Sequence, residues 1–392
     1  MTATKREWRG LVVLVAGTPW DGNMQFASHH VARHLTRYAP VLYVEPPQSP
    51  VARWRRGDRR NLVRSRCRVV EPRIAVLKLA APPHPSHPVI SPFARRIAHF
   101  ALRRAVRSLD GDVQAVMTFA PATRMFGACG ERIDVYYAKD DFSAAGDLLG
   151  RYSGHIGAAE EWAASHADLV VAHSPTLMER WEVYTPLFIP NGVDPAAFEE
   201  VDAAPLPSDV TLPRPIVGFV GHMSNRVDLS ILRAIAASGR SLLIVGPRQS
   251  TFSVERIADL LARPNVQWVG VKPYDDLPSY LRVIDVGIVP YDDSAFNRAS
   301  FPLKTLEYLA AGRPVVATGL PAVHWLGTDL VRIADDPDAF AGAVEAAIAE
   351  GVDDAHIRAR REFARDHSWA ARVRSLATAI GLPEPDDRSI DR

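Results

Sequence analysis

Residues 295–318, AFNRASFPLKTLEYLAAGRPVVAT, place a loop, a helix and a strand in direct succession. The loop at 301–303 leads into the helix, and Ala-Ala-Gly at 310–312 closes it. The β-branched run PVVAT at 314–318 then forms the strand. A helix that passes directly into a short apolar strand is one unit of an alternating α/β fold.

The start of this helix also carries chemistry. Lys304 lies in the first turn, and Glu307 lies one turn later on roughly the same face. Unpaired N–H groups at a helix N-terminus favour a phosphate, and so does the helix dipole. A cation for phosphate beside a carboxylate for a ribose diol is what a pocket for a nucleoside diphosphate requires.

The same alternation extends over most of the chain. In the first half we expect strands at 11–16, 41–45, 74–79, 113–119, 133–138 and 168–173, and helices at 24–38, 91–109, 152–166 and 175–183. In the second half we expect strands within 215–221, 241–246, 266–270, 284–290, 314–318 and 330–334. Such nearly continuous apolar runs are typical of parallel strands buried on both faces. The sequence therefore predicts an α/β protein with two doubly wound, Rossmann-like sheets.

The length predicts two domains, because 392 residues exceed the roughly 250–300 residues at which a single core stops growing. From Pro195 to Pro215 the pattern lapses and five prolines occur. We therefore expect a first domain at 1–194, a linker at 195–214 and a second domain from residue 215.

The composition narrows the class of protein. Apolar residues make up 47% and charged residues 23%, which argues against wholesale disorder. The 46 basic and 45 acidic residues leave a net charge of +1, so no general affinity for polyanions follows. Two cysteines, Cys67 and Cys129, form neither a disulfide framework nor a cysteine-rich zinc site, and a cytosolic protein is expected.

No apolar run approaches the roughly 18 residues that a membrane-spanning helix needs. LVVLVAG (11–17) follows basic residues, as in a signal peptide, but it is short and ends in Thr-Pro-Trp-Asp rather than a small-residue cleavage site. We interpret it as a first buried strand.

Residues 51–110 are locally basic, with 15 Lys or Arg against 3 Asp or Glu. One interpretation is a solvated, arginine-rich surface. The other is a surface for anionic membrane headgroups or for a phosphate-bearing acceptor. Nucleic acid is a weaker option, because no aromatic–basic interleaving or binding module accompanies the charge.

Four motifs in order carry a family resemblance: NGVD (191–194), GVKPYDDLPSYLRVIDVGIVPY (270–291), the stretch 295–318 and HSWAARV (367–373). Together they resemble the retaining glycosyltransferases of family 4, which have the GT-B fold of two Rossmann-like domains facing a cleft. The resemblance implies that the first domain binds the acceptor and that the second, ending near residue 367, binds a nucleotide-sugar. It also implies a closing helix at 368–382 that crosses back to the first domain; residues 383–392 look like a disordered tail.

The resemblance assigns donor-binding residues. Glu307 matches the glutamate that binds the nucleotide ribose, and the segment near Tyr274 matches the base-binding segment. Arg226 follows the strand IVGFVG as a phosphate clamp that neutralises the leaving diphosphate, or it is a loop arginine paired with Asp228. The expected donor-binding set is Gly17, Gly221, Arg226, Tyr274, Arg298, Pro302, Leu303, Lys304 and Glu307. Because a carboxylate at a helix start is expected outside the core, Glu307→Ala should abolish donor binding and leave the fold intact.

One residue departs from the family pattern. The family's first glutamate, which touches the donor sugar, lies eight residues before the second, and here that position is Ala299. Subgroups with a P-L-K-x-x-E-Y-L-A-x-G core also lack it. Asp292, Asp293, Asn297 and Arg298 in the preceding loop are the possible substitutes, and the sequence does not choose among them.

The acceptor side is expected at KDDF (139–142), which follows a strand at the edge where ligands of such sheets bind. Asp140 or Asp141 is a candidate general base, with a helix N-cap as the alternative. Glu160 and Glu161 are expected on a helix surface. Trp20 either borders the acceptor site or belongs to the core.

We expect no essential metal and no cofactor. Neither KDD nor YDDS is the D-x-D of metal-dependent glycosyltransferases. His29, His30 and His34 lack a carboxylate partner, and His84 and His87 lie in a proline-rich loop over the acceptor side.

The expected function is transfer of a sugar from a nucleotide-diphosphate donor to a saccharide, lipid-linked or cell-envelope acceptor, with retention. The expected location is the cytoplasm or the inner face of the plasma membrane. Two alternatives stay open, a catalytically inactive auxiliary protein and a nucleotide-sugar 2-epimerase. A dinucleotide oxidoreductase is disfavoured because no G-x-G-x-x-G follows the first strand of either half. The sequence does not choose among UDP, GDP and TDP donors.

Overall fold

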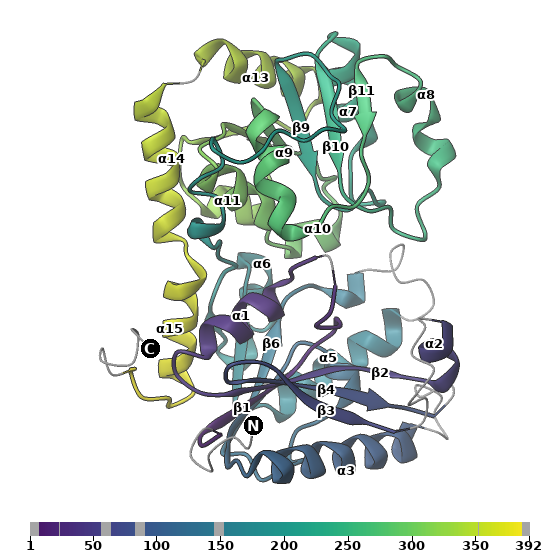
Figure 1. The fold of residues 1–392 in the computed structure, drawn as a ribbon, viewed down its shortest axis with the longest axis vertical. Helices are drawn as coiled ribbons and strands as arrows, with labels where there is room; N and C mark the ends of the chain where they lie inside the picture. Colours follow the sequence, from purple (N-terminus) through teal and green to yellow (C-terminus); the bar gives the residue numbers. More distant parts are fainter. Residues whose placement is uncertain are drawn as a thin grey trace.

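The computed structural model describes residues 8–22, 24–55, 64–82, 91–144, 153–351 and 353–385. Within these ranges the chain forms two α/β domains, one above the other in Figure 1. The loop that contains His84 and His87 lies outside the described residues, as does most of the expected tail. Among the helices of the described ranges, none combines the length and the hydropathy required to cross a bilayer.

The first domain contains an eight-stranded sheet in the order β3-β4-β2-β1-β5-β6-β7-β8. Its strands are β1 (Leu11–Val15), β2 (Val41–Gln48), β3 (Arg66–Glu71), β4 (Ile74–Ala80), β5 (Val113–Thr118), β6 (Ile133–Ala138), β7 (Leu169–Ala172) and β8 (Leu187–Phe188). Every pairing is parallel except that of β3 with β4. The six strands expected here are confirmed. The edge strands β3 and β8 were not predicted, because β3 alternates arginines with small apolar residues and β8 has only two residues.

The second domain contains a six-stranded parallel sheet in the order β11-β10-β9-β12-β13-β14. Its strands are β9 (Ile216–Val220), β10 (Ser241–Val245), β11 (Val266–Trp268), β12 (Val286–Val289), β13 (Val315–Ala317) and β14 (Val331–Ile333). Strand β9 lies in the centre and is buried along its whole length. All six expected strands are present, and the predicted fold class of two Rossmann-like sheets is confirmed.

Helices cover the faces of both sheets (Figure 1). They are α1 (Ala27–Leu35), α2 (Pro50–Arg55), α3 (Ser91–Leu109), α5 (Ser153–His166), α6 (Pro175–Arg180), α7 (Leu229–Ala237), α8 (Ala258–Leu261), α9 (Leu277–Val283), α10 (Ala295–Ala299), α11 (Leu303–Ala310), α12 (Pro321–Trp325), α13 (Pro337–Glu350), α14 (Asp354–Asp366) and α15 (Trp369–Ala379). Short 3₁₀ turns lie at Pro121–Thr123, Phe142–Ala144, Glu182–Tyr184, Pro195–Ala197, Val254–Ile257 and Tyr274–Asp276. The long helix α3 spans the residues that its apolar periodicity predicted.

The proline-rich segment after Asp194 packs on the second domain. Phe198 and Val201 are fully buried in a cluster that also contains Leu281 and Phe301. Apolar side chains anchor this segment even though its sequence shows no regular period.

The C-terminal helices run along one side of both domains (yellow in Figure 1). Helix α14 contacts α11 of the second domain, whereas α15 packs on α1 of the first. Where the chain passes between them, the Trp369 amide donates to the Val193 carbonyl at 2.9 Å. A Cβ at Gly192 would lie 2.7 Å from the Trp369 nitrogen, so only glycine permits this close approach.

A buried histidine joins the two domains to α15. The ring of His30 on α1 is stacked on Trp369, with centroids 5.4 Å apart and planes 6° apart, and lies 5.8 Å edge-on from Tyr274 of the second domain. Burial lowers the pKa of His30 to about 3.

This histidine should make stability depend on pH. Its folded pKa of about 3 lies below the ordinary value of 6.5, so between these values the unfolded chain binds a proton that the folded chain excludes. Stability therefore falls as the pH falls from about 6 to 4, by about 1.4 kcal/mol per pH unit for this group. In His30→Phe, which keeps a ring in the stack, we expect urea unfolding at successive pH values to show a correspondingly shallower slope. The exposed-site control His155→Gln should keep the wild-type slope, and an unchanged slope in His30→Phe would contradict the assignment.

Candidate active site

The carboxyl ends of both sheets face a cleft between the domains. Thr18, Asp140 and His173 follow strands of the first sheet, and Gly221 follows β9 of the second. These residues line one cavity of about 270 Å³, together with the start of α11. The chain thus places its strand ends where ligands of open α/β sheets bind.

The loop and first turn of α11 contribute Pro302, Leu303, Lys304 and Glu307 to this cavity. Pro302 is the N-cap residue, and its own side chain makes no hydrogen bond to the first N–H groups of the helix. The Lys304 ammonium and the Glu307 carboxylate form an ion pair at 2.5 Å. The expected pairing of cation and carboxylate is therefore present at the helix N-terminus.

The expectation that Glu307 lies outside the core is wrong. The residue is only 6% exposed, because α11 is buried on most sides between the second sheet and α14. Glu307→Ala would open a cavity as well as remove a charge, so Glu307→Gln is the cleaner probe of the carboxylate.

Arg226 reaches the cavity from the loop after β9. Its Nε donates to Asn297 Oδ1 at 2.7 Å, and its guanidinium lies 4.8 Å from the centroid of the Tyr291 ring. Asp228 instead accepts from the Ser230 amide and caps α7, so the alternative in which it pairs with Arg226 is wrong. The Phe296 ring lies 4.9 Å from the same guanidinium, so Asn297 and two aromatic rings hold Arg226 where it lines the cavity.

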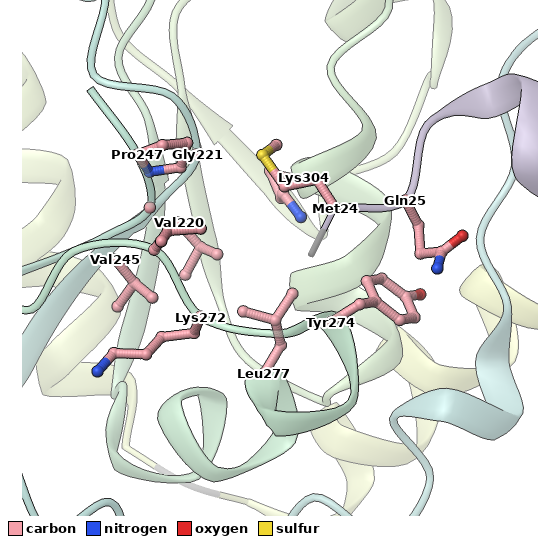
Figure 2. A pocket seen from close by; sticks show the side chains of 12 residues that line it. Met24, Gln25, Val220, Gly221, Val245, Pro247, Lys272, Tyr274, Leu277 and Lys304 are labelled. Atoms are coloured by element: carbon pink, nitrogen blue, oxygen red, sulfur yellow. The ribbon is translucent and has the colours of Figure 1, made fainter. Parts of the chain in front are cut away.

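A second, smaller cavity of about 40 Å³ adjoins the first and shares Lys304 and Gly221 with it. Figure 2 shows Met24 and Gln25 of the first domain on one side, Leu277 and Tyr274 of the second domain below, and the Lys304 ammonium directed inward. Lys272 extends away from the centre and binds Asp209. An apolar slot beside a cationic cleft suits a flat, partly aromatic group attached to an anion.

The first domain supplies two potential bases. Asp140 accepts a hydrogen bond from Ser300 Oγ at 3.2 Å across the domain boundary. His173 is buried, and its Nδ1 donates to the Ala138 carbonyl at 3.1 Å, which leaves Nε2 as the basic nitrogen. Burial lowers the pKa of His173, so the ring is neutral near pH 7.

Lys139 completes the positive charge of the cleft, where burial lowers the pKa of its ammonium. Gly17 does not line the cavity itself; a Cβ at this position would lie 3.5 Å from the Lys139 Nζ. Because 3.5 Å is an ordinary contact distance, the structure shows no steric requirement for glycine at this position. Trp20 is buried against His29 and Tyr43 and belongs to the core.

The two neighbouring aspartates Asp140 and Asp141 have different roles in the structure. Asp141 pairs with Arg180 and accepts from the Ala144 amide at 3.1 Å, so it caps the 3₁₀ turn as in the alternative considered from sequence. Arg180 also binds Glu160, which is fully buried and accepts from the Tyr136 hydroxyl at 3.2 Å. The expectation of a surface position is wrong for Glu160, whose pKa burial raises to about 7, and correct for Glu161.

Ala299 does not face the cleft. It is fully buried in a cluster with Leu177 and Trp181 of the first domain, and its carbonyl accepts from Ser174 Oγ at 2.6 Å. None of the four proposed substitutes is among the residues that line the cavity. Asn297 holds Arg226 and the Asp292 loop in place, and Asp293 pairs with the exposed Arg298.

Several residues of the cleft were not predicted from the sequence. Lys139 and His173 follow the expected strands directly, and their position at the strand ends was the available signal. Met24, Gln25 and Ser300 come from loops, and no local pattern places a loop from one domain against the other.

Two Rossmann-like domains that face each other across a charged cleft define the GT-B fold. In agreement, the chain superposes on sucrose-phosphate synthase from Thermosynechococcus elongatus with a TM-score of 0.72 at 17% identity, over 94% of this chain and 98% of that one. It also superposes on HepE from Anabaena, solved with UDP and glucose, with a TM-score of 0.63 at 14% identity, over 94% and 98% of the two chains.

Residues 214–350 match the family described as Glycosyl transferases group 1. The putative teichuronic acid biosynthesis glycosyltransferase TuaH of Bacillus subtilis is 33% identical over 200 residues, which are 50% of this chain and 50% of that protein. The match thus spans about half the length of this relative. The chain therefore has the GT-B fold, as predicted, and its residues 214–350 are similar to the group 1 glycosyltransferases.

The packing of Ala299 yields a prediction for the glutamate that the family pattern places there. Ala299→Glu should not create a donor contact but should bury an unpaired carboxylate, which destabilises by about 3–5 kcal/mol. We expect a markedly lower unfolding midpoint in urea, whereas Ala346→Glu on the exposed face of α13 should leave the midpoint nearly unchanged. Wild-type stability together with tighter nucleotide binding in Ala299→Glu would show instead that this position opens to the donor.

Proposed function

We propose that this protein transfers a glycosyl group from a nucleotide-diphosphate-sugar to an acceptor hydroxyl. The observation that carries the proposal is the meeting of Lys304, Glu307 and Arg226 at the N-terminus of α11, beside an apolar slot and opposite Asp140. No single one of these residues is diagnostic. Together they provide separate environments for a base, a ribose, a diphosphate and an acceptor.

The donor would lie across both cavities. Its base would enter the slot beside Tyr274, and its ribose diol would donate to Glu307. Its diphosphate would meet the first N–H groups of α11, with Lys304 and Arg226 as counter-charges. Because Lys304 is paired with Glu307, donor binding would exchange one ion pair for phosphate and ribose contacts.

The transfer step uses residues of both domains. The acceptor oxygen attacks the anomeric carbon on the same face from which the diphosphate departs, the bond from that carbon to the diphosphate oxygen breaks, and the nucleoside diphosphate leaves with the bonding electrons. The acceptor proton passes to Asp140, and Arg226 and Lys304 stabilise the charge that develops on the leaving group. We propose retention at the anomeric carbon, as in the family that the motifs resemble, and a reaction without an essential metal or cofactor.

For the acceptor we propose a saccharide of the cell envelope or one carried on a lipid. The relative TuaH is named for teichuronic acid biosynthesis, which supports a cell-envelope acceptor. The basic segment 51–110 would hold the protein at the inner face of the plasma membrane, where such an acceptor is presented. A catalytically inactive auxiliary protein is the second candidate, and Ala299 in place of a sugar-facing carboxylate favours it.

Donor binding is tested by thermal unfolding with UDP, GDP, TDP and NAD, each in the presence of a chelator. A ligand at 100 times its Kd adds about 2.7 kcal/mol and raises the midpoint by a few degrees. We expect one nucleoside diphosphate to stabilise the wild type and Glu307→Gln to bind it about 10- to 100-fold more weakly, because a hydrogen bond to a charged group is lost.

The exposed carboxylate Glu362 on α14 provides the matched control, and Glu362→Gln should bind like the wild type. Stabilisation by NAD alone, or equal affinity in Glu307→Gln, would contradict the donor site. Donor binding without release of nucleoside diphosphate in the presence of envelope extracts would favour the auxiliary protein.

A further inference from the structure

A second concave site lies in the first domain, outside the interdomain cleft. It is a groove of about 680 Å³ between α3 and the hairpin of β3 and β4. Arg64 and Arg66 line it from the hairpin side, and Ile97, Phe100 and Arg104 line it from α3. None of the residues named as its lining carries a carboxylate.

Helix α3 has two apolar stripes, one that faces the core and one that faces solvent. Ala98, Leu102 and Val106 face the core and are buried. A separate stripe, Phe93, Ile97, Phe100 and Arg104, recurs with helical spacing, and its two phenylalanines are 60% and 63% exposed. Exposed aromatic side chains gathered on a basic surface mark an interaction site rather than a core.

The groove belongs to the basic segment 51–110. Of the three acidic residues there, Glu71 is paired with Arg33, Asp110 lies in the turn after α3, and Asp58 lies outside the described ranges. The side chains of Arg66 and Arg104 are both exposed. The groove therefore combines positive charge with an apolar wall, which suits an anionic amphiphile.

The position of the groove connects it with the carboxyl edge of the sheet. Ala80 lines the groove and pairs with Gln48 at the end of β2. Helix α2 begins two residues after Gln48 and carries Trp54, which is 57% exposed. Only this end of the groove reaches the carboxyl edge of the sheet, because its lining continues along α3 to Ser108. Figure 1 shows α3 on the side of the first domain that lies away from the second domain, so the groove is separate from the interdomain cleft.

We propose that this groove binds the phosphate headgroup of an anionic bilayer lipid, an inference that rests on the membrane-borne acceptor of the proposed function. The headgroup phosphate lies among Arg64, Arg66 and Arg104, and the rings of Phe100 and Trp54 enter the interfacial layer. Nucleic acid fits less well, because Ile97, which lines the groove together with Phe100, does not stack on a base but does enter hydrocarbon.

The test is co-sedimentation of the full-length protein with vesicles, without nucleotide or acceptor. We expect binding to phosphatidylcholine vesicles that contain phosphatidylglycerol, and little binding to phosphatidylcholine alone. Each arginine near an anionic surface contributes roughly five-fold to partitioning, so Arg66→Ala/Arg104→Ala should bind about 25-fold more weakly, and less steeply with salt. Phe100→Ala should lose about ten-fold, because a ring no longer enters the interface.

The matched control is Arg358→Ala/Arg374→Ala, which removes two exposed arginines from α14 and α15 and should bind like the wild type. If the control variant loses as much vesicle binding, the binding depends on net charge alone, and the proposed site is contradicted. Binding of inorganic phosphate or of single-stranded RNA through Arg66 and Arg104, without binding to vesicles, would also overturn it. Stabilisation by the nucleoside diphosphate is measured on the same samples. If the nucleotide stabilises the protein but vesicles do not bind, only the lipid site is contradicted. If vesicles bind but the nucleotide does not stabilise the protein, only the donor site is contradicted.

Discussion

The organisation of the site depends on how three backbone carbonyls from one short segment of the second domain dock on the first. The carbonyls of Arg298, Ala299 and Phe301 accept hydrogen bonds from Thr176, Ser174 and Asn191, at 2.8, 2.6 and 3.2 Å. These residues directly precede α11. The bonds therefore fix the helix N-terminus that carries Lys304 opposite the strand ends that carry Asp140 and His173, and charges of both domains share one cavity.

This docking also explains the departure from the family pattern at Ala299. A small side chain is required there, because the position is filled by Leu177 and Trp181 and is not open to the cleft. The charge of the site resides instead in Lys139, Arg226 and Lys304, opposed by Asp140 and the buried Glu307. Such a site is prepared for an anion. Of these three cations, Lys304 is neutralised by an ion pair within α11.

Much of the fold follows from the sequence, because buried parallel strands and amphipathic helices leave strong periodic signals. All twelve expected strands formed, and β3 and β8 escaped prediction because edge strands bury too little to enforce a pattern. The donor half of the cleft was also predictable, since Lys304 and Glu307 share one helix. The remaining features of the site depend on tertiary packing between residues that are far apart in the chain. Examples are the ion pair of Asp141 with Arg180, the burial of Glu160 and the contact of Met24 with residues of the second domain.

The most direct measurement is a crystal structure of the protein with the nucleoside diphosphate that stabilises it. We expect density for the base beside Tyr274 and Leu277, the ribose hydroxyls within hydrogen-bond distance of Glu307, and the phosphates between Lys304 and Arg226. A nucleotide bound elsewhere, or one whose phosphates point away from α11 while the Lys304–Glu307 pair stays intact, would contradict the assignment of this cleft as a donor site.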